Sequence, residues 1–161
     1  MHALLLAITL APPSYADLKL AIEARRLAFR AAYTSTDSLG RAAIVDSARA
    51  YLFDRVTLDV LPAWHGTRWD FNGTTRTPGH GTIACGYFVN TVLQDAGFRL
   101  PRVKWSQMAA EPITLKTCHI VKRFRDRPVS EVAAWLKAQG GGLYKVGPGN
   151  HVGFIVDRGA R

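Results

Sequence analysis

The chain has 161 residues and a formal net charge of +9, because 21 lysines and arginines outnumber 12 acidic residues. This charge favours anionic partners, but the basic residues are scattered and no nucleic-acid motif accompanies them, so specific nucleic-acid binding is not expected. A chain of this length supports one domain with a real core and is too short for two.

Residues 1–16 have the features of a secretory signal peptide. An uncharged apolar run over residues 3–11 is followed by Ser-Tyr-Ala at 14–16, which fits the small-residue cleavage pattern and makes Asp17 the new first residue. The run is too short to span a bilayer, so no transmembrane segment is expected. Because no lysine or arginine precedes the run, the start of a buried helix is the competing interpretation. We expect a secreted or periplasmic protein with a single domain over residues 17–161.

Two helices are expected after this segment. Residues 17–33 are rich in Ala, Leu, Glu and Arg, which favour a helix. Asp37 or Ser38 can cap a second helix that runs to Leu61, and Pro62 is expected to stop it. Both helices are interpreted as packing elements.

A loop and then a cysteine-bearing helix are expected in the middle of the chain. Residues 64–81 combine glycines with aromatic residues and predict a loop with one short strand. From Cys85 onward, apolar residues have the spacing of one helical face, and Gly97 supplies the left-handed residue that ends a helix. In the first turn of a helix, unpaired N–H groups and the positive end of the dipole favour a thiolate, the form that attacks carbonyl groups. Gly86 is expected to leave room for a substrate. The alternative is that Cys85 is simply the first residue of the buried stripe.

The segment between this helix and the C-terminal region gives weaker signals. A helix around residues 105–110 and a further element around 113–121 are expected. Ser130 is expected to cap a helix that places Val132, Trp135 and Leu136 inward and is ended by the glycines at 140–142.

The C-terminal region predicts a β-hairpin that carries His151. Two apolar runs flank Gly-Pro-Gly-Asn at 147–150, so His151 is expected to open the second strand. Side chains alternate along a strand, which places Gly153 beside the imidazole and leaves space there. A lone histidine at the start of a strand is often a surface or capping residue, so its combination with Cys85 is what indicates a catalytic base.

Neither a metal site nor a disulfide is expected. His65, His80, Cys118 and His119 show no recognised ligand spacing, so no metal or cofactor is predicted. A Cys85–Cys118 bridge would occupy the nucleophile, and a domain of this length does not need one for stability. We therefore expect a free Cys85 and a structural Cys118.

These residues, in this order, resemble the NlpC-type cell-wall peptidases, a compact branch of the papain-like cysteine peptidases. The resemblance covers about residues 64–157 and rests on the cysteine helix, the His-Val-Gly segment at His151 and the approach at 66–73. It implies an α+β fold of papain-like architecture, with N-terminal helices and a catalytic helix packed on a small antiparallel sheet. It also implies hydrolysis of amide bonds in peptidoglycan peptides, with peptidoglycan or another anionic cell-wall polymer as partner. Cys85 would be the nucleophile, His151 the base and then the acid, and Trp69 would stand where the family has a tyrosine near the substrate.

The sequence departs from that family in three respects. Ala84 and Gly86 flank the cysteine where the family has Asp and Ser, and the indole of Trp69 donates a hydrogen bond but neither accepts one nor titrates. The family orients its histidine with a third polar residue on the following strand. Asp157 lies six residues from His151 on the same strand, roughly 20 Å away if extended, so the orienting group is beyond the end of this chain, contributed from elsewhere, or absent. The competing functions are a non-catalytic cell-wall-binding domain on the same scaffold and a Cys–His acyltransferase.

Overall fold

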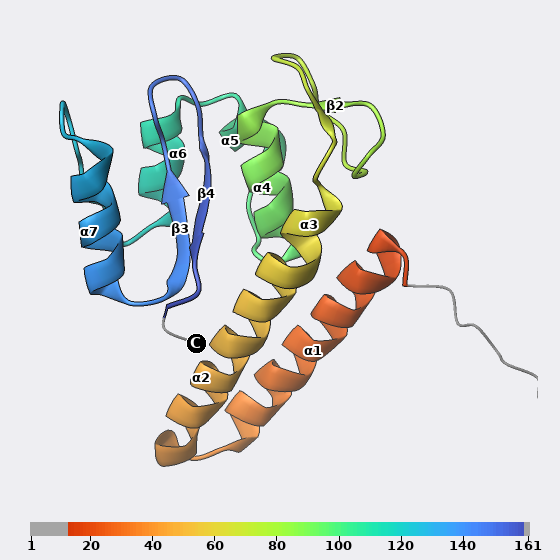
Figure 1. Cartoon of the computed structure of the whole chain (residues 1–161). Coiled ribbons are helices and arrows are strands. Elements are labelled where there is room, and N and C mark those ends of the chain that lie inside the picture. The colour runs from red at the N-terminus through yellow and green to blue at the C-terminus, as the bar shows by residue number, and fades with distance from the viewer. Residues whose placement is uncertain (1–12, 160–161) are drawn as a thin grey trace, which may run out of the picture.

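The computed structural model describes residues 13–159 and shows a mixed α+β chain (Figure 1). A hairpin of two long helices, α1 (Tyr15–Ser35) and α2 (Ser38–Arg55), projects from a body that contains the remaining elements. The apolar run at 3–11 of the expected signal peptide lies outside the described residues. Within residues 13–159, no helix is long and apolar enough to cross a membrane.

Helix α1 begins two residues earlier than predicted and includes part of the expected cleavage motif. Ser14 is its N-cap, and Ser14 and Asp17 form a reciprocal capping box. The hydroxyl of Tyr15 donates a hydrogen bond of 2.6 Å to Asp95 and accepts one of 3.0 Å from Trp64 Nε1. Cleavage after residue 16 would therefore remove both the helix cap and a side chain that links α1 to the body.

The second predicted helix continues through Pro62 by changing its winding. Asp37 caps α2 as expected and accepts a hydrogen bond from the N–H of Gly40. A π-helical turn, η1 (Val56–Val60), then leads into the short α3 (Leu61–Ala63). Proline has no N–H and its ring clashes with the carbonyl four residues back, so the wider π turn accommodates it without ending the helix. In a π turn, the residue at position 62 would donate its N–H to the carbonyl of Thr57, five residues earlier. Proline has no N–H, and this carbonyl accepts a hydrogen bond from Arg158 Nη2 at 3.4 Å.

Two separate two-stranded sheets complete the body. Strands β1 (Arg68–Trp69) and β2 (Thr82–Ile83) pair in parallel and frame the loop predicted before the cysteine. Strands β3 (Gly142–Val146) and β4 (Gly153–Asp157) form the expected antiparallel hairpin. Helix α4 (Cys85–Asp95) packs on β4, with the rings of Phe88 and Phe154 at 6.0 Å in an edge-to-face arrangement.

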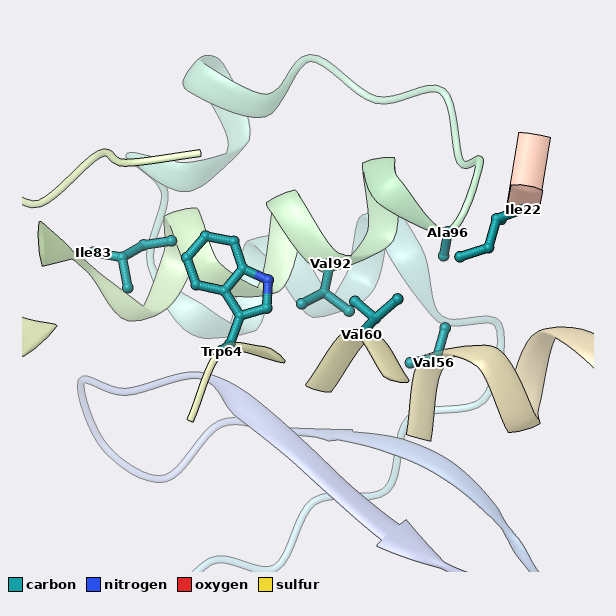
Figure 2. Packing of buried hydrophobic residues seen from close by; sticks show 7 residues of the cluster. All are labelled: Ile22, Val56, Val60, Trp64, Ile83, Val92 and Ala96. Carbon is teal, nitrogen blue, oxygen red and sulfur yellow. The ribbon is translucent and has the colours of Figure 1, made fainter. Parts of the chain in front are cut away.

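The buried core joins the helical hairpin to α4. Figure 2 shows Trp64 alongside α4, with Val60 and Val92 facing one another beside it. The buried cluster consists of Ile22, Val56, Val60, Trp64, Ile83, Val92 and Ala96. Full burial of one aliphatic side chain contributes about 1.5–3 kcal/mol. This cluster therefore fixes α4, and with it the cysteine at its start, relative to α1 and η1.

The segments that gave weak sequence signals are helical, with shifted boundaries. Helices α5 (Arg102–Ser106) and α6 (Ala110–Thr117) replace the elements expected around 105–110 and 113–121. Helix α7 (Val129–Gln139) ends before Gly140, as predicted, and Trp135 packs against Phe124 and Tyr144. The prediction that Ser130 caps α7 is wrong, because Pro128 occupies the N-cap position and Ser130 lies inside the first turn.

Candidate active site

Cys85 is the first residue of α4, as the sequence predicted. Ala84 before it is extended (φ −80°, ψ 154°) and provides no side-chain cap for the N–H groups of the first turn. The helix ends at Asp95 with Ala96 as its C-cap, and Gly97 (φ +93°) follows with its N–H donating to the carbonyl of Gln94. The half-buried thiol of Cys85 is thus at the positive end of an uncapped helix that is anchored in the core.

His151 lies in the turn of the β-hairpin, just before β4. Its backbone N–H donates to the carbonyl of Pro148 at 3.0 Å, and β4 begins only at Gly153. The prediction that His151 opens the strand is therefore wrong by two residues, because this local hydrogen bond keeps the backbone in a turn. Val152 is 6% exposed and anchors the turn to the body. Gly153 leaves the expected space, since a Cβ built there meets no atom within 4 Å.

Trp69 connects the histidine turn to the segment that precedes Cys85. The indole and imidazole ring centroids are 6.0 Å apart with an interplanar angle of 61°. Trp69 pairs with Ile83 in the β1–β2 register, and Ile83 is two residues before the cysteine, roughly 7 Å along an extended chain. The loop before α4 and the turn before β4 therefore meet near the N-terminal end of α4. The indole is 59% exposed, so one of its faces is available to a ligand.

The loop before α4 is held by polar contacts that the sequence did not reveal. Gly73 lies so close to the backbone of Ile83 that a Cβ there would collide with it, and Ala84 N–H bonds the carbonyl of Gly73 at 2.9 Å. Arg102, only 4% exposed, donates to the carbonyls of Thr74 and Thr75 at 3.0 and 2.8 Å. Burial lowers the pKa of this guanidinium. Arg102 is a positioning residue for the loop, and a basic residue after a proline gives no sequence signal for that role.

Gly86 does not provide the expected room for a substrate. It is buried, and a Cβ built on it would lie 2.5 Å from the carbonyl oxygen of Ser106 in α5. The hydroxyl of Ser106 also donates to the carbonyl of Gly86 at 3.1 Å and accepts from Asn90. The absence of a side chain at Gly86 therefore allows α4 and α5 to pack closely, which is a structural role.

The described residues provide no hydrogen-bonding group that orients His151. Among residues 13–159, the imidazole has the ring contact with Trp69 and no hydrogen bond. Asp157 is at the far end of β4, where its carboxylate accepts from the N–H of Gly159 at 2.9 Å. The third residue that the family resemblance implies is thus not found in the part of the chain that the structure describes.

The second cysteine lies in a separate polar cluster. Cys118 follows α6, half-buried and free like Cys85, with its sulfur 3.8 Å from Thr117 Oγ1. The same hydroxyl accepts from Lys145 Nζ at 3.0 Å, and burial lowers the pKa of Lys145 to about 8. No group of three or more potential metal ligands occurs within the described residues.

Comparison of the chain with protein-family models, curated proteins and solved structures finds no match. Function is therefore inferred from the residues and their geometry.

Proposed function

We propose that this protein is a thiol hydrolase of the NlpC type, with a papain-like arrangement in which Cys85 and His151 cleave an amide bond. The observation that carries the proposal is the position of Trp69. Its ring packs against His151, and its backbone pairs beside the segment that leads into Cys85. The packing of α4 on β4 through Phe88 and Phe154 supports the same arrangement, because it joins the helix that begins with Cys85 to the strand that follows the His151 turn.

The proposed reaction is acyl transfer to sulfur followed by hydrolysis. The Cys85 thiolate attacks the amide carbonyl carbon, and the uncapped N–H groups of the first turn of α4 stabilise the oxyanion. The imidazolium of His151 donates its proton to the leaving amine as the C–N bond breaks, which leaves a thioester on Cys85. A water molecule then attacks the thioester carbonyl carbon and transfers a proton to His151, and the C–S bond breaks to release Cys85 as thiolate. The products are an amine and a carboxylic acid, and the thiolate–imidazolium pair is restored.

The proposed substrate is a peptide of peptidoglycan, and the proposed site of the reaction is outside the cytoplasm. The family resemblance suggests this class of substrate, and the net charge of +9 favours attraction to an anionic cell-wall polymer. The exposed indole of Trp69 provides an apolar surface beside the proposed thiol–imidazole pair. Gly153 leaves open space on the histidine side, whereas α5 fills the space at Gly86.

One observation favours a second function, a cell-wall-binding domain without turnover. In the described part of the chain the imidazole of His151 lacks a hydrogen-bonding partner, and the loss of the orienting residue lowers kcat by about 10⁴ in a well-studied triad. The exposed face of Trp69 and the net charge of +9 do not depend on that partner, so binding would persist without it.

Purified muropeptides test the two functions together. Released amines are followed by mass spectrometry and binding by calorimetry, for the unmodified protein, Cys85→Ser and the matched control Cys118→Ser. The hydrolase predicts amine release that disappears in Cys85→Ser and persists in Cys118→Ser. Tight binding without release, unchanged in Cys85→Ser, would instead support the binding domain. If the muropeptides are neither bound nor cleaved, the proposed substrate class is refuted.

A further inference from the structure

A hollow lies at the opposite end of α4 from Cys85, where the helical hairpin meets the body. Its cavity volume is about 200 Å³. Apolar side chains form most of its wall: Ile22 and Phe29 of α1, Ala48, Tyr51 and Leu52 of α2, and Ala96 after α4. Engineered apolar cavities of about 150 Å³ hold a benzene molecule. This hollow therefore has the size for one aromatic ring or a short alkyl chain.

Small residues help to keep this hollow open beside a pair of aromatic rings. Phe29 and Tyr51 pack at 5.9 Å, and Ala48 lies in the wall beside them. At the end of α4, Gly97 has a positive φ of 93° and the stem of Arg26 lies across it, with Cδ 2.7 Å from the position a Cβ would take. A larger residue at Gly97 would displace Arg26, so the opening depends on this glycine.

The hollow adjoins a polar pocket that is lined by more positive than negative side chains. The hollow and the polar pocket share Arg26, Gly97 and Phe98, and Glu23 and Arg99 line only the polar pocket. Arg26 is already engaged by Glu23 through two hydrogen bonds of 2.7 and 2.6 Å. Arg99 is exposed and makes no hydrogen bond or salt bridge within residues 13–159. The hydrogen bond from Arg26 lowers the pKa of Glu23, and the charge of Arg99 adds to this effect.

Further positive charge lies over the aromatic wall. The guanidinium of Arg25 is 4.6 Å from the ring centroid of Phe29. Arg25, Arg26 and Arg99 thus lie with Glu23 around the apolar hollow and the polar pocket beside it, and the exposed guanidinium of Arg99 has donors without a hydrogen-bonding partner in residues 13–159.

We propose that this hollow binds a free small carboxylate with a compact apolar tail. The tail lies between α1 and α2, and the carboxylate accepts hydrogen bonds from Arg99. A neutral ligand of the same shape would gain no charge-assisted hydrogen bond from Arg99, and a cationic one would be repelled. A second copy of this chain fits poorly, because it would bring its own net charge of +9 to a positive surface. The proposal is independent of Cys85 and of the hydrolase.

Three ligands with the same tail test the proposal: octanoate, octanol and octylamine, measured by calorimetry on the whole chain. Octanoate is expected to bind about tenfold more tightly than octanol, and octylamine more weakly than either. Arg99→Gln is expected to remove the advantage of octanoate over octanol. Arg125→Gln changes the net charge equally at a distant exposed position, and is expected to preserve that advantage.

A second pair of variants tests the hollow itself. Ala48→Leu fills it and is expected to abolish binding of all three ligands, whereas Ala50→Leu, exposed on the same helix, is expected to bind as the unmodified protein does. Thermal unfolding checks that both variants fold. The proposal is refuted if octanoate binds no better than octanol, if Arg99→Gln and Arg125→Gln behave alike, or if folded Ala48→Leu still binds octanoate.

Discussion

Tyr15→Phe removes one hydroxyl group that joins the start of α1 to the body of the protein. The hydroxyl donates to Asp95 at 2.6 Å and accepts from Trp64 Nε1 at 3.0 Å, so both partners lose a hydrogen bond. The carboxylate of Asp95 is only 12% exposed and retains Lys19 at 4.0 Å. The ring of Tyr15 stays in its edge contact with Trp64. Because a hydrogen bond to a charged group contributes about 1.5–3 kcal/mol, we expect the free energy of unfolding to fall by about 2 kcal/mol.

The assay is urea unfolding followed by tryptophan fluorescence, with Tyr33→Phe as the control. A loss of this size corresponds to a decrease in Tm of about 4–8 °C. Burial raises the pKa of Asp95, while the Tyr15 hydrogen bond favours its ionised form. The effect of Tyr15→Phe should therefore be full above the pKa of Asp95 and shrink as the pH falls and the carboxyl group takes up a proton. A loss under about 0.5 kcal/mol at neutral pH, or an equal loss in Tyr33→Phe, would refute this account.

Three further predictions concern the close packing, a half-buried amine and the ring beside the proposed base. Gly86→Ala is expected to lower the free energy of unfolding by about 2 kcal/mol in urea titrations, because the new Cβ would lie 2.5 Å from the Ser106 carbonyl oxygen. The folded-state pKa of Lys145 is about 8 against 10.5 unfolded, so the folded state binds fewer protons between these values and stability rises with pH across that range. Lys145→Met should abolish this pH dependence and add about 1 kcal/mol at pH 7, a value already reduced for solvent screening of a half-exposed group. Trp69→Ala is expected to lower kcat about tenfold or more and Trp69→Phe much less, because an aromatic ring packs against His151.

A specific result would contradict each of the predictions for Gly86, Lys145 and Trp69. Gly153→Ala is the control for Gly86→Ala, since its Cβ meets no atom within 4 Å, and equal losses in the two variants would exclude a packing effect at Gly86. Stability that falls between pH 8 and 10.5, with the same slope in Lys145→Met, would rule out a buried amine of lowered pKa. If Trp69→Ala raised KM and left kcat unchanged, the ring would serve ligand binding alone.

Local sequence signals predicted the elements whose boundaries depend on neighbouring residues. The apolar spacing after Cys85 and the glycine at 97 predicted α4 correctly, because a helix face and a left-handed terminus are both local properties. The turn signals at 147–150 predict the hairpin correctly. The hydrogen bond from the His151 N–H to the Pro148 carbonyl extends the turn, so that β4 begins at Gly153. Pro62 was expected to end a helix, and the π turn before it accommodated the proline instead.

The sequence could not predict contacts between residues far apart in the chain. Tyr15 and Asp95 are 80 positions apart, so a side chain interpreted as part of a cleavage motif proved to be a structural link. The prediction that Gly86 leaves room for a substrate fails because Ser106 packs beside it, and nothing in the sequence indicates that contact. The contact between Trp69 and His151 likewise depends on β1 pairing with β2 and on the position of the later hairpin. Such pairs follow from tertiary packing, which single-residue patterns do not encode.

Alkylation by iodoacetamide tests the proposed pair of Cys85 and His151 most directly, because it reports on the thiol without assuming a substrate. The rate at each cysteine is measured by peptide mass spectrometry from pH 5 to 9 in the folded protein and in His151→Ala. We predict that Cys85 reacts at least about tenfold faster than Cys118 near neutral pH, and that His151→Ala slows Cys85 without changing Cys118. Equal slow labelling of both cysteines, or a Cys85 rate unaffected by His151→Ala, would contradict the thiol–imidazole pair and with it the proposed hydrolase.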